Sequence, residues 1–350
     1  MTTSRQVVYF TAPREVVVRT EPLPPPGAGQ VLVRTLVSAV SAGTEMLVYR
    51  GEMPVDVPLD ETIAGMSQPF HYPTPYGYAA VGEVIAVGAG VDADWSGRRV
   101  FAFVPHQSHF VAAPRELVAV PADLSPHDAA FLPFVETAVS LVMDGQPVIG
   151  ERVAVWGQGV IGLLTTAILS RFPLAALVAI DPLPLRRARA LALGAHAAFF
   201  PDAAVDLAAA LGPDGADLGY ELSGSPAALN QAITAVGFGA RLVVGSWYGQ
   251  KPVSLALGGA FHRRHLRLIS SQVSHLAPRW LARWSKERRL AVAWEFLSEL
   301  RPAASLITHR FSWCDAPLAY QLLDQNPDAI LQLVFDASFQ SHLKNSSQED

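Results

Sequence analysis

A short apolar run followed by three spaced glycines is the pattern in this chain that most clearly implies chemistry. Residues 153–156 are apolar, and Gly157, Gly159 and Gly162 then open a second apolar run at residues 160–170. In a strand, turn and helix of this kind, the first glycine permits a tight turn and the second lets the backbone approach a pyrophosphate. The third glycine lets the helix pack on the strand, and the helix N-terminus faces the phosphates. The pattern predicts a dinucleotide-binding site.

A carboxylate after the next apolar run bears on which dinucleotide binds. Asp181 follows residues 176–180 and lies beyond Gly162 at about the 20-residue spacing at which an acid accepts a hydrogen bond from a ribose 2′-hydroxyl. A carboxylate at this point repels a 2′-phosphate, whereas an arginine nearby accommodates one. The carboxylate makes NAD the expected cofactor. NADP is left open because Arg186 and Arg187 follow Asp181 closely.

Small and polar residues at two further strand ends are expected to line the same groove. An open parallel sheet binds its ligands outside the carboxyl ends of its strands, and the turns of interest begin at residues 223 and 245. The expected cofactor-binding residues of this region are Gly157, Gly159, Val160, Ile161, Gly162, Asp181, Arg186, Ser223, Gly224, Ser225, Gly245 and Ser246.

The middle of the chain alternates between strand and helix patterns, which predicts a parallel sheet covered on both faces. The predicted strands are residues 153–156, 176–180, 198–200, 218–222 and 242–244, and the predicted helices are residues 160–171, 185–193, 205–211 and 226–235. Residues 1 to about 135 are instead β-rich, with short apolar runs separated by proline and glycine. We therefore predict an α/β fold with a doubly wound parallel sheet and a second, β-rich part.

The last part of the chain has a different pattern. After about residue 262 the strand and helix alternation fades, and residues 279–301 are typical of charged helices. A strand, a helix and a strand are then predicted at residues 307–311, 316–324 and 330–335. Residues 338–350 are polar and lack periodicity, as in a flexible tail.

Length and composition indicate a two-domain globular protein of 350 residues, half of them apolar. The net charge is −5 and charged residues make up 16%, so nothing points to a nucleic-acid partner. The single cysteine, Cys314, excludes an internal disulfide and a cysteine-rich zinc lobe. Residues 1–13 lack the pattern of a secretory signal, and glycines interrupt the apolar stretch at residues 153–170. We expect a cytoplasmic enzyme with a small-molecule substrate and no membrane span.

Four further motifs accompany the glycine pattern. They are residues 41–45 (Ser-Ala-Gly-Thr-Glu), 76–84 (Tyr-Gly-Tyr-Ala-Ala-Val-Gly-Glu-Val), 97–100 (Gly-Arg-Arg-Val) and 132–138 (Leu-Pro-Phe-Val-Glu-Thr-Ala). With them, almost the whole chain resembles the medium-chain dehydrogenase/reductase superfamily. The resemblance implies a GroES-like catalytic domain over residues 1–135 and 263–337, a Rossmann domain over residues 136–262, and a homodimer.

The resemblance also implies where a catalytic zinc is held, and this chain departs from the pattern there. Zinc-dependent members carry a cysteine, a histidine and a third cysteine or glutamate at positions that match Ala42, Tyr78 and Pro133 here. A catalytic zinc needs about three nitrogen, sulfur or oxygen side-chain ligands. If the match at the third position is shifted from Pro133, Glu136 becomes a candidate ligand, but one carboxylate still lacks the other ligands. We therefore expect a zinc-independent member that binds no metal.

Two threonines match positions that contact substrate or cofactor in the superfamily. The resemblance places Thr44 at the hydroxyl that relays the substrate proton in alcohol-oxidising members, and Thr137 against the nicotinamide. The histidine that continues the relay in many members is replaced by Leu47. The outer part of that relay is therefore expected to be missing.

Without zinc, another group has to polarise the substrate oxygen during hydride transfer. We expect Thr44 or Tyr78 to donate a hydrogen bond to this oxygen, and His106 to act as general acid or base. Glu136 is expected to orient or charge-balance that histidine. The alternative is that Tyr78 only fills the space of the lost ligand, that His106 is a loop residue, and that Glu136 caps the helix after Pro133.

Several of these motifs are most similar to one branch of the superfamily, the dehydrogenases that oxidise a 3-hydroxyethyl bacteriochlorophyllide in pigment biosynthesis. The motifs are residues 41–45, 49–52, 76–78, 105–107 and 136–139. The likeness implies hydride transfer between a nicotinamide and a bulky secondary alcohol or ketone. Residues 261–274 match that branch less closely, so the substrate stays open. An NADPH-dependent ene or quinone reductase, and a non-catalytic dinucleotide-binding scaffold or sensor, are the alternatives.

Overall fold

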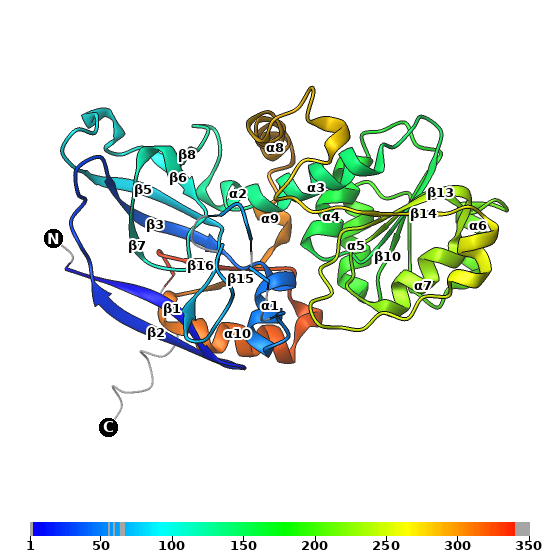
Figure 1. Ribbon diagram of the computed structural model, residues 1–350, viewed down its shortest axis with the longest axis horizontal. Coiled ribbons are helices and arrows are strands. Elements are labelled where there is room, and N and C mark those ends of the chain that lie inside the picture. Colours follow the sequence, from blue (N-terminus) through cyan, green and yellow to red (C-terminus); the bar gives the residue numbers. More distant parts are fainter. Residues whose placement is uncertain (1–2, 55–56, 59, 64–66, 340–350) are drawn as a thin grey trace. The chain divides into compact units, whose positions relative to one another are not determined.

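The computed structural model describes residues 3–54, 57–58, 60–63 and 67–339, which fall into two compact units (Figure 1). The first unit contains the chain up to Leu132 and again from Arg301, and the second contains Pro133–Leu300. The polar stretch expected to form a flexible tail lies outside the described residues from position 340 onward.

The second unit is a parallel sheet with helices packed on it. Its elements are α3 Leu132–Gly145, β9 Arg152–Trp156, α4 Val160–Leu169, β10 Ala176–Ile180, α5 Pro184–Ala192, β11 Ala197–Phe199, α6 Ala204–Leu211, β12 Ala216–Glu221, α7 Pro226–Ala235, β13 Val236–Val244, β14 Arg267–Ser270 and α8 Lys286–Leu300. The strand order is β11-β10-β9-β12-β13-β14, and all neighbouring strands are parallel. The order therefore reverses between β9 and β12, which is where such sheets bind a dinucleotide.

Apolar side chains cover both faces of the central strands. On one face Trp156 and Ile180 pack with Leu207 of α6 and Leu229 of α7, and Figure 1 shows both helices beside the sheet. Val155, which points to the other face, is fully buried as well. A strand buried on both faces gives a continuous apolar run, which explains why the sequence pattern locates β9 and β10 to within one residue.

The sheet extends one strand further than the sequence pattern indicates. β14 pairs in parallel with β13, with Arg241 opposite Arg267 and Val244 opposite Ser270. It is a four-residue edge strand with polar residues at both ends, so it lacks the apolar run of a central strand. The expectation that strands fade out after residue 262 is therefore wrong at residues 267–270.

The boundary between the two units also differs from the expected one. The second unit extends to Leu300 rather than to residue 262, and it begins at Pro133 rather than at residue 136. The reason is that β14 continues the parallel sheet and that Arg289 of α8 bonds to Glu136 of α3. Both segments therefore pack with the second unit before the chain returns to the first.

The first unit is built from two sheets of mainly antiparallel strands. Its elements are β1 Ser4–Ala12, β2 Glu15–Pro22, β3 Val31–Ala39, α1 Ala42–Arg50, β4 Thr74–Pro75, β5 Ala80–Val87, β6 Arg99–Ala102, β7 His109–Ala112, β8 Val118–Ala119, α2 Pro126–Ala129, α9 Ala303–Leu306, β15 Ile307–Phe311, α10 Ala316–Gln325 and β16 Gln332–Asp336. One sheet has the order β2-β1-β4, and the other β15-β16-β3-β5-β6-β8, with β7 also pairing with β3. Because β16 pairs with β3, the C-terminal segment completes the sheet that the N-terminal part begins.

An aromatic core fixes α1 in this unit. Tyr320 of α10 contacts Phe10 edge-on, with ring centroids 4.9 Å apart, and stacks on Tyr49 of α1 at 5.8 Å. Buried side chains of α1, including Met46 and Val48, belong to the same cluster. The first turn of α1, which contains Thr44, is therefore held by a packed core.

A helix that crosses a bilayer needs about 20 apolar residues. Within the part of the chain that the structure describes, no helix combines the required length and apolar character.

Candidate functional site

The turn between β9 and α4 is tight at its first and third glycines and open at the second. Gly157 has a φ of +89°, a conformation that L side chains rarely adopt, and a Cβ added there lies 2.5 Å from the backbone nitrogen of Ser223. A Cβ on Gly162 lies 1.9 Å from the carbonyl oxygen of Gly157. At Gly159 an added Cβ meets none of the described atoms within 4 Å. Only the second glycine therefore leaves room for a ligand against the backbone.

Helix α4 presents its N-terminus at this open point. Gly159 is its N-cap residue, no side chain of the described residues caps the helix end, and Val160 and Ile161 are partly buried. The first backbone N–H groups of a helix have no partner within the helix, and the helix dipole favours an anion there. The turn and the helix end are therefore suited to a phosphate.

Asp181 lies buried at the carboxyl end of β10, beside the glycine turn. Its Oδ2 accepts a hydrogen bond from the backbone N–H of Gln158 at 2.7 Å, and its Oδ1 accepts one from Leu183 N–H at 2.8 Å. Arg186 Nη1 is 3.8 Å from Oδ2, whereas Arg187 donates to the carbonyl oxygens of Asp181 and Pro182. A carboxylate and a cation thus stand together where the sequence predicts the ribose.

The turns after β12 and β13 are joined by a carboxylate that sequence reasoning missed. Glu221 is fully buried, and its Oε1 accepts hydrogen bonds from Ser223 N–H at 2.7 Å and from Gly224 N–H at 3.1 Å. Gly224 N–H also lies 2.8 Å from Ser246 Oγ, and Tyr248 OH donates to Glu221 Oε2 at 2.7 Å. Burial, followed by the bond to Glu221 and its charge, raises the pKa of Tyr248. The sequence did offer one signal for Glu221, because an acid stands there at the end of a buried strand and just before Ser-Gly-Ser.

Ser225 and Gly245 complete the same two turns. Ser225 is the N-cap of α7, with its Oγ 3.5 Å from the N–H of Ala228. Gly245 donates its N–H to the carbonyl oxygen of Glu221 at 3.0 Å, and a Cβ added to it lies 2.4 Å from Leu141 of α3. The strand end at β13 is therefore in close contact with α3.

Helix α3 carries two of the predicted site residues. Thr137 is partly buried and donates its hydroxyl to the carbonyl oxygen of Pro133 at 2.8 Å. The neighbouring Glu136 accepts hydrogen bonds from Arg289 Nη2 and Nε at 2.8 and 3.1 Å. Arg289 was not among the predicted site residues, because nothing in the sequence links position 136 to position 289.

In the first unit, three hydroxyl groups gather at the first turn of α1. Tyr78 OH donates a hydrogen bond to Ser41 Oγ, and the hydroxyl of Thr44 is close enough to act on the pKa of the phenol. Burial raises the pKa of Tyr78 to about 12, although hydrogen bonding to Ser41 and Thr44 acts in the opposite direction. The phenol therefore stays protonated, and remains a hydrogen-bond donor, over the whole physiological pH range.

A buried polar network lies behind these hydroxyl groups. His106 Nε2 is 2.9 Å from Glu45 Oε2, and His106 Nδ1 is 2.7 Å from Ser38 Oγ; all three side chains are fully buried. Glu45 Oε1 accepts the backbone N–H of Ser41 at 2.7 Å, and Tyr320 OH donates to Oε2. Glu45 therefore holds Ser41, the residue that accepts the hydrogen bond from the Tyr78 phenol.

The network corrects one expected pairing. Glu136 was expected to orient His106, but both ring nitrogens of His106 are already bonded within its own unit, to Glu45 and Ser38. Glu136 pairs with Arg289 instead. The partner of the histidine is thus Glu45, the acid of the 41–45 motif.

The positions at which zinc-dependent relatives carry ligands offer no ligand set here. Ala42 has only a methyl side chain, Tyr78 donates its phenol hydrogen to Ser41, and Pro133 lacks a donor atom on its side chain. Among the described residues no group of three or more histidine, cysteine, aspartate or glutamate side chains is close enough to hold a metal ion.

Comparison with known proteins relates this geometry to dehydrogenases. The family model of zinc-binding dehydrogenases matches residues 160–288, which include α4 and Asp181. D-guloside 3-dehydrogenase of Escherichia coli (strain K12) is 24% identical over 327 residues, or 87% of this chain and 92% of its own length. The 2-desacetyl-2-hydroxyethyl bacteriochlorophyllide A dehydrogenase of Cereibacter sphaeroides is 28% identical over 346 residues, or 94% of this chain and 97% of its own length.

A solved structure has the same fold. The crystal structure of a short chain alcohol dehydrogenase from Escherichia coli CFT073, complexed with cofactor NADH, matches with a TM-score of 0.76 at 19% identity. The match covers 96% of this chain and 100% of that chain. The fold predicted from the sequence, a Rossmann parallel sheet plus a β-rich GroES-like domain, is confirmed.

Proposed function

We propose that this enzyme, which is similar to zinc-binding and other dehydrogenases, belongs to the medium-chain dehydrogenase/reductase superfamily and interconverts a bulky secondary alcohol and its ketone with NAD and without catalytic zinc. The observation that carries this proposal is the cluster of Tyr78, Ser41 and Thr44, in which burial keeps the phenol protonated. These hydroxyl groups take the place of metal as the groups that polarise the substrate oxygen.

The residues of the second unit fit a nicotinamide dinucleotide. The open backbone at Gly159 and the uncapped N-terminus of α4 suit the pyrophosphate, and Asp181 suits a ribose hydroxyl. Such a coenzyme, when bound, supplies or accepts the hydride. Since Arg186 lies near Asp181, NADP remains a weaker second choice.

The residues do not fit a catalytic zinc. Ala42 and Pro133 have no donor atom on their side chains, and the phenol of Tyr78, with its pKa raised to about 12, is a neutral hydrogen-bond donor rather than an anionic ligand. A zinc site needs about three protein ligands plus an open position. We therefore assign no step to a metal.

Hydroxyl groups can do the work that a Lewis acid does elsewhere. A hydrogen bond to the substrate oxygen, from Thr44 or from Tyr78 once its single hydroxyl hydrogen turns from Ser41 to the substrate, stabilises the negative charge that develops there. A preorganised donor of this kind is worth about 10²–10³ in rate. Leu47, which stands where many relatives continue a proton relay, is buried and apolar. We propose that His106, enclosed and bonded on both nitrogens, orients Glu45 and does not exchange a proton with substrate.

The substrate class is supported by two relatives. Their names describe dehydrogenases of a guloside and of a hydroxyethyl bacteriochlorophyllide. We propose a bulky alcohol for this chain on that basis, and pigment biosynthesis as one setting for it.

A homodimer is proposed as well. β14 is an edge strand of the parallel sheet, and a free strand edge is a ready template for pairing with a second copy. Light scattering on the eluting protein tests this, since a monomeric mass at micromolar concentration contradicts it.

The activity is tested with purified protein, NAD and NADP, and a panel of secondary alcohols that ranges from 2-butanol to aryl and glycoside alcohols. We expect NADH formation that is fastest with bulky alcohols. Reduction of activated C=C bonds with NADPH, without alcohol oxidation, would identify an ene or quinone reductase instead. Tight binding of NAD without turnover of any substrate would identify a scaffold or sensor.

A further inference from the structure

We infer that the buried pair of Arg289 and Glu136 is a positioning device for the nicotinamide half of the coenzyme site, an inference that rests on the proposed function. Arg289 is 1% exposed, and its Nε and Nη2 donate to Glu136 Oε1 at 3.1 and 2.8 Å. Nη2 also donates to the carbonyl oxygen of Val273 at 2.6 Å. One guanidinium thus ties α8, α3 and the loop after β14 together.

Arg289 of α8 joins α3 and the loop after β14, and both lie toward the half of the sheet that is left for the nicotinamide mononucleotide of the coenzyme. The glycine turn and Asp181 belong to the β9–β10 half of the sheet, which leaves the β12–β13–β14 half for the other mononucleotide. Val273 is in the loop that leaves the carboxyl end of β14, and Glu136 directly precedes Thr137 on α3. A Cβ on Gly245, at the end of β13, would touch α3. Arg289 therefore sets the spacing between α3 and the loop that leaves β14.

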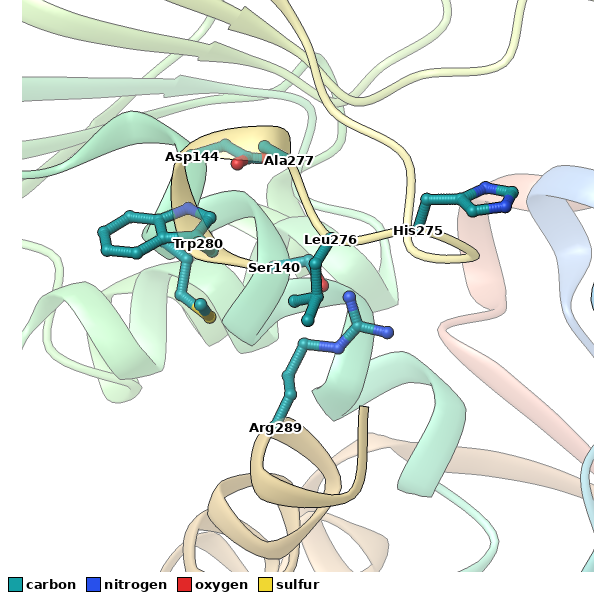
Figure 2. A pocket seen from close by; sticks show the side chains of 8 residues that line it. Ser140, Asp144, His275, Leu276, Ala277, Trp280 and Arg289 are labelled. Carbon is teal, nitrogen blue, oxygen red and sulfur yellow. The ribbon is translucent and has the colours of Figure 1, made fainter. Parts of the chain in front are cut away.

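The guanidinium is only partly satisfied by the protein. Nη1 of Arg289 is buried and has no hydrogen-bond partner among the described residues. Figure 2 shows the side chain extending from α8 toward Leu276 and away from Trp280, with Ser140 of α3 close by. Buried donors without a partner are rare in native proteins, and Nη1 keeps a hydrogen bond to donate that the described residues do not accept.

A second, partly buried arginine–glutamate pair in the same unit provides a control. Arg241 Nη2 donates to Glu151 Oε1 and Oε2 at 2.7 and 2.6 Å, and Arg241 Nε donates to the carbonyl oxygen of Gly145 at 2.9 Å. Glu151 precedes β9, so this pair lies at the amino ends of the strands, opposite the coenzyme edge. Its loss should disturb the fold without selecting one half of the coenzyme.

The experiment compares two probes by calorimetry: NADH, and ADP-ribose, which lacks the nicotinamide. For Arg289→Met we expect the Kd of NADH to rise at least about tenfold, the change that about 1.4 kcal/mol produces, while the Kd of ADP-ribose changes less than about twofold. For Arg241→Met we expect both Kd values to change by the same factor. Arg289→Lys, which keeps the charge but loses the planar fork, serves if the methionine variant fails to fold. We expect Arg289→Lys to weaken the binding of NADH but not that of ADP-ribose.

Two results would overturn the inference. Equal weakening of NADH and ADP-ribose in both Arg289 variants would reduce the pair to a structural element. Selective loss of NADH binding in Arg241→Met would show that an arginine–glutamate pair at the opposite end of the strands has the same effect. If the wild-type protein bound neither NADH nor ADP-ribose, the proposed function itself would be overturned. If the wild type bound both probes and the Arg289 variants raised the two Kd values equally, this inference alone would be overturned.

Discussion

Glu45 Oε2 lies 2.9 Å from His106 Nε2, and neither side chain is exposed to solvent. This bond joins the first turn of α1 to the segment before β7. A Cβ added to Gly77 would lie 2.6 Å from His106 Cδ2, so the imidazole is packed against the backbone that leads into Tyr78. The phenol that we assign to the substrate oxygen is therefore supported from behind by a buried acid and a buried histidine.

Glu45→Ala should lower the free energy of unfolding by about 3 kcal/mol or more, because several buried groups that bond to this carboxylate are left without their partner, at about 1–3 kcal/mol each. Ser41 N–H and Tyr320 OH lose their acceptor at the same time. The control is Glu83→Ala, whose partner Arg34 is half exposed, so that the loss stays below about 1 kcal/mol. Urea unfolding measures both, and similar losses for the two variants would contradict the role of the network.

Tyr78 should titrate near pH 12 rather than near its ordinary pKa of 10.0. Burial favours the neutral phenol, so the contribution of Tyr78 to stability is complete below pH 10 and is lost as the pH rises through 12. Tyrosinate absorbance of the wild type minus that of Tyr78→Phe isolates this phenol in the folded protein. A difference signal that appears near pH 10 would show that the phenol is solvated.

Thr44→Val should lower kcat about a hundredfold, within the range typical of a positioned proton-transfer or donor group. The Kd of NADH should change less than about twofold, because Thr44 is not part of the dinucleotide turn. Thr11→Val on β1 is the control, since its hydroxyl donates only to a backbone carbonyl at the surface. An unchanged rate in Thr44→Val would remove this hydroxyl from the mechanism.

Asp181→Ala should raise the Kd of NAD about tenfold or more, the effect expected when a hydrogen bond to a charged group is lost. The Kd of NADP should rise less, because removing the carboxylate also removes its repulsion of the 2′-phosphate. Arg186→Ala should weaken NADP alone. If Asp181→Ala raised the Kd values of NAD and NADP by the same factor, Asp181 would not be the residue that binds the ribose hydroxyl.

The strand, glycine turn and helix of the expected dinucleotide site could be predicted from the sequence because each of these elements has a local sequence pattern. Gly157, Gly162 and Asp181 follow consecutive apolar strands, and the close contacts at the two glycines are made within the same strand, turn and helix or with the next strand of the sheet. Strands buried on both faces leave a continuous apolar run, so their positions were predictable as well. β14 was not, since a short edge strand with polar ends leaves no such run.

The polar pairs could not be predicted, because each joins residues that are distant in the chain. Glu45 pairs with His106, and Glu136 with Arg289, through contacts that exist only in the folded units. The sequence pointed to His106 and Glu136 as catalytic candidates, with Glu136 expected to orient His106, whereas the fold pairs each with another residue. Nothing local distinguishes that pairing from the ones that the fold makes.

The most direct test of the account is the zinc content of active enzyme. Protein purified without added metal, treated with a chelator and dialysed, is assayed for NAD-dependent alcohol oxidation while elemental analysis measures its zinc. We predict full turnover at a zinc content far below one ion per chain, with no gain when zinc is added back. Turnover that falls with zinc removal and returns in proportion to zinc added would contradict the central claim.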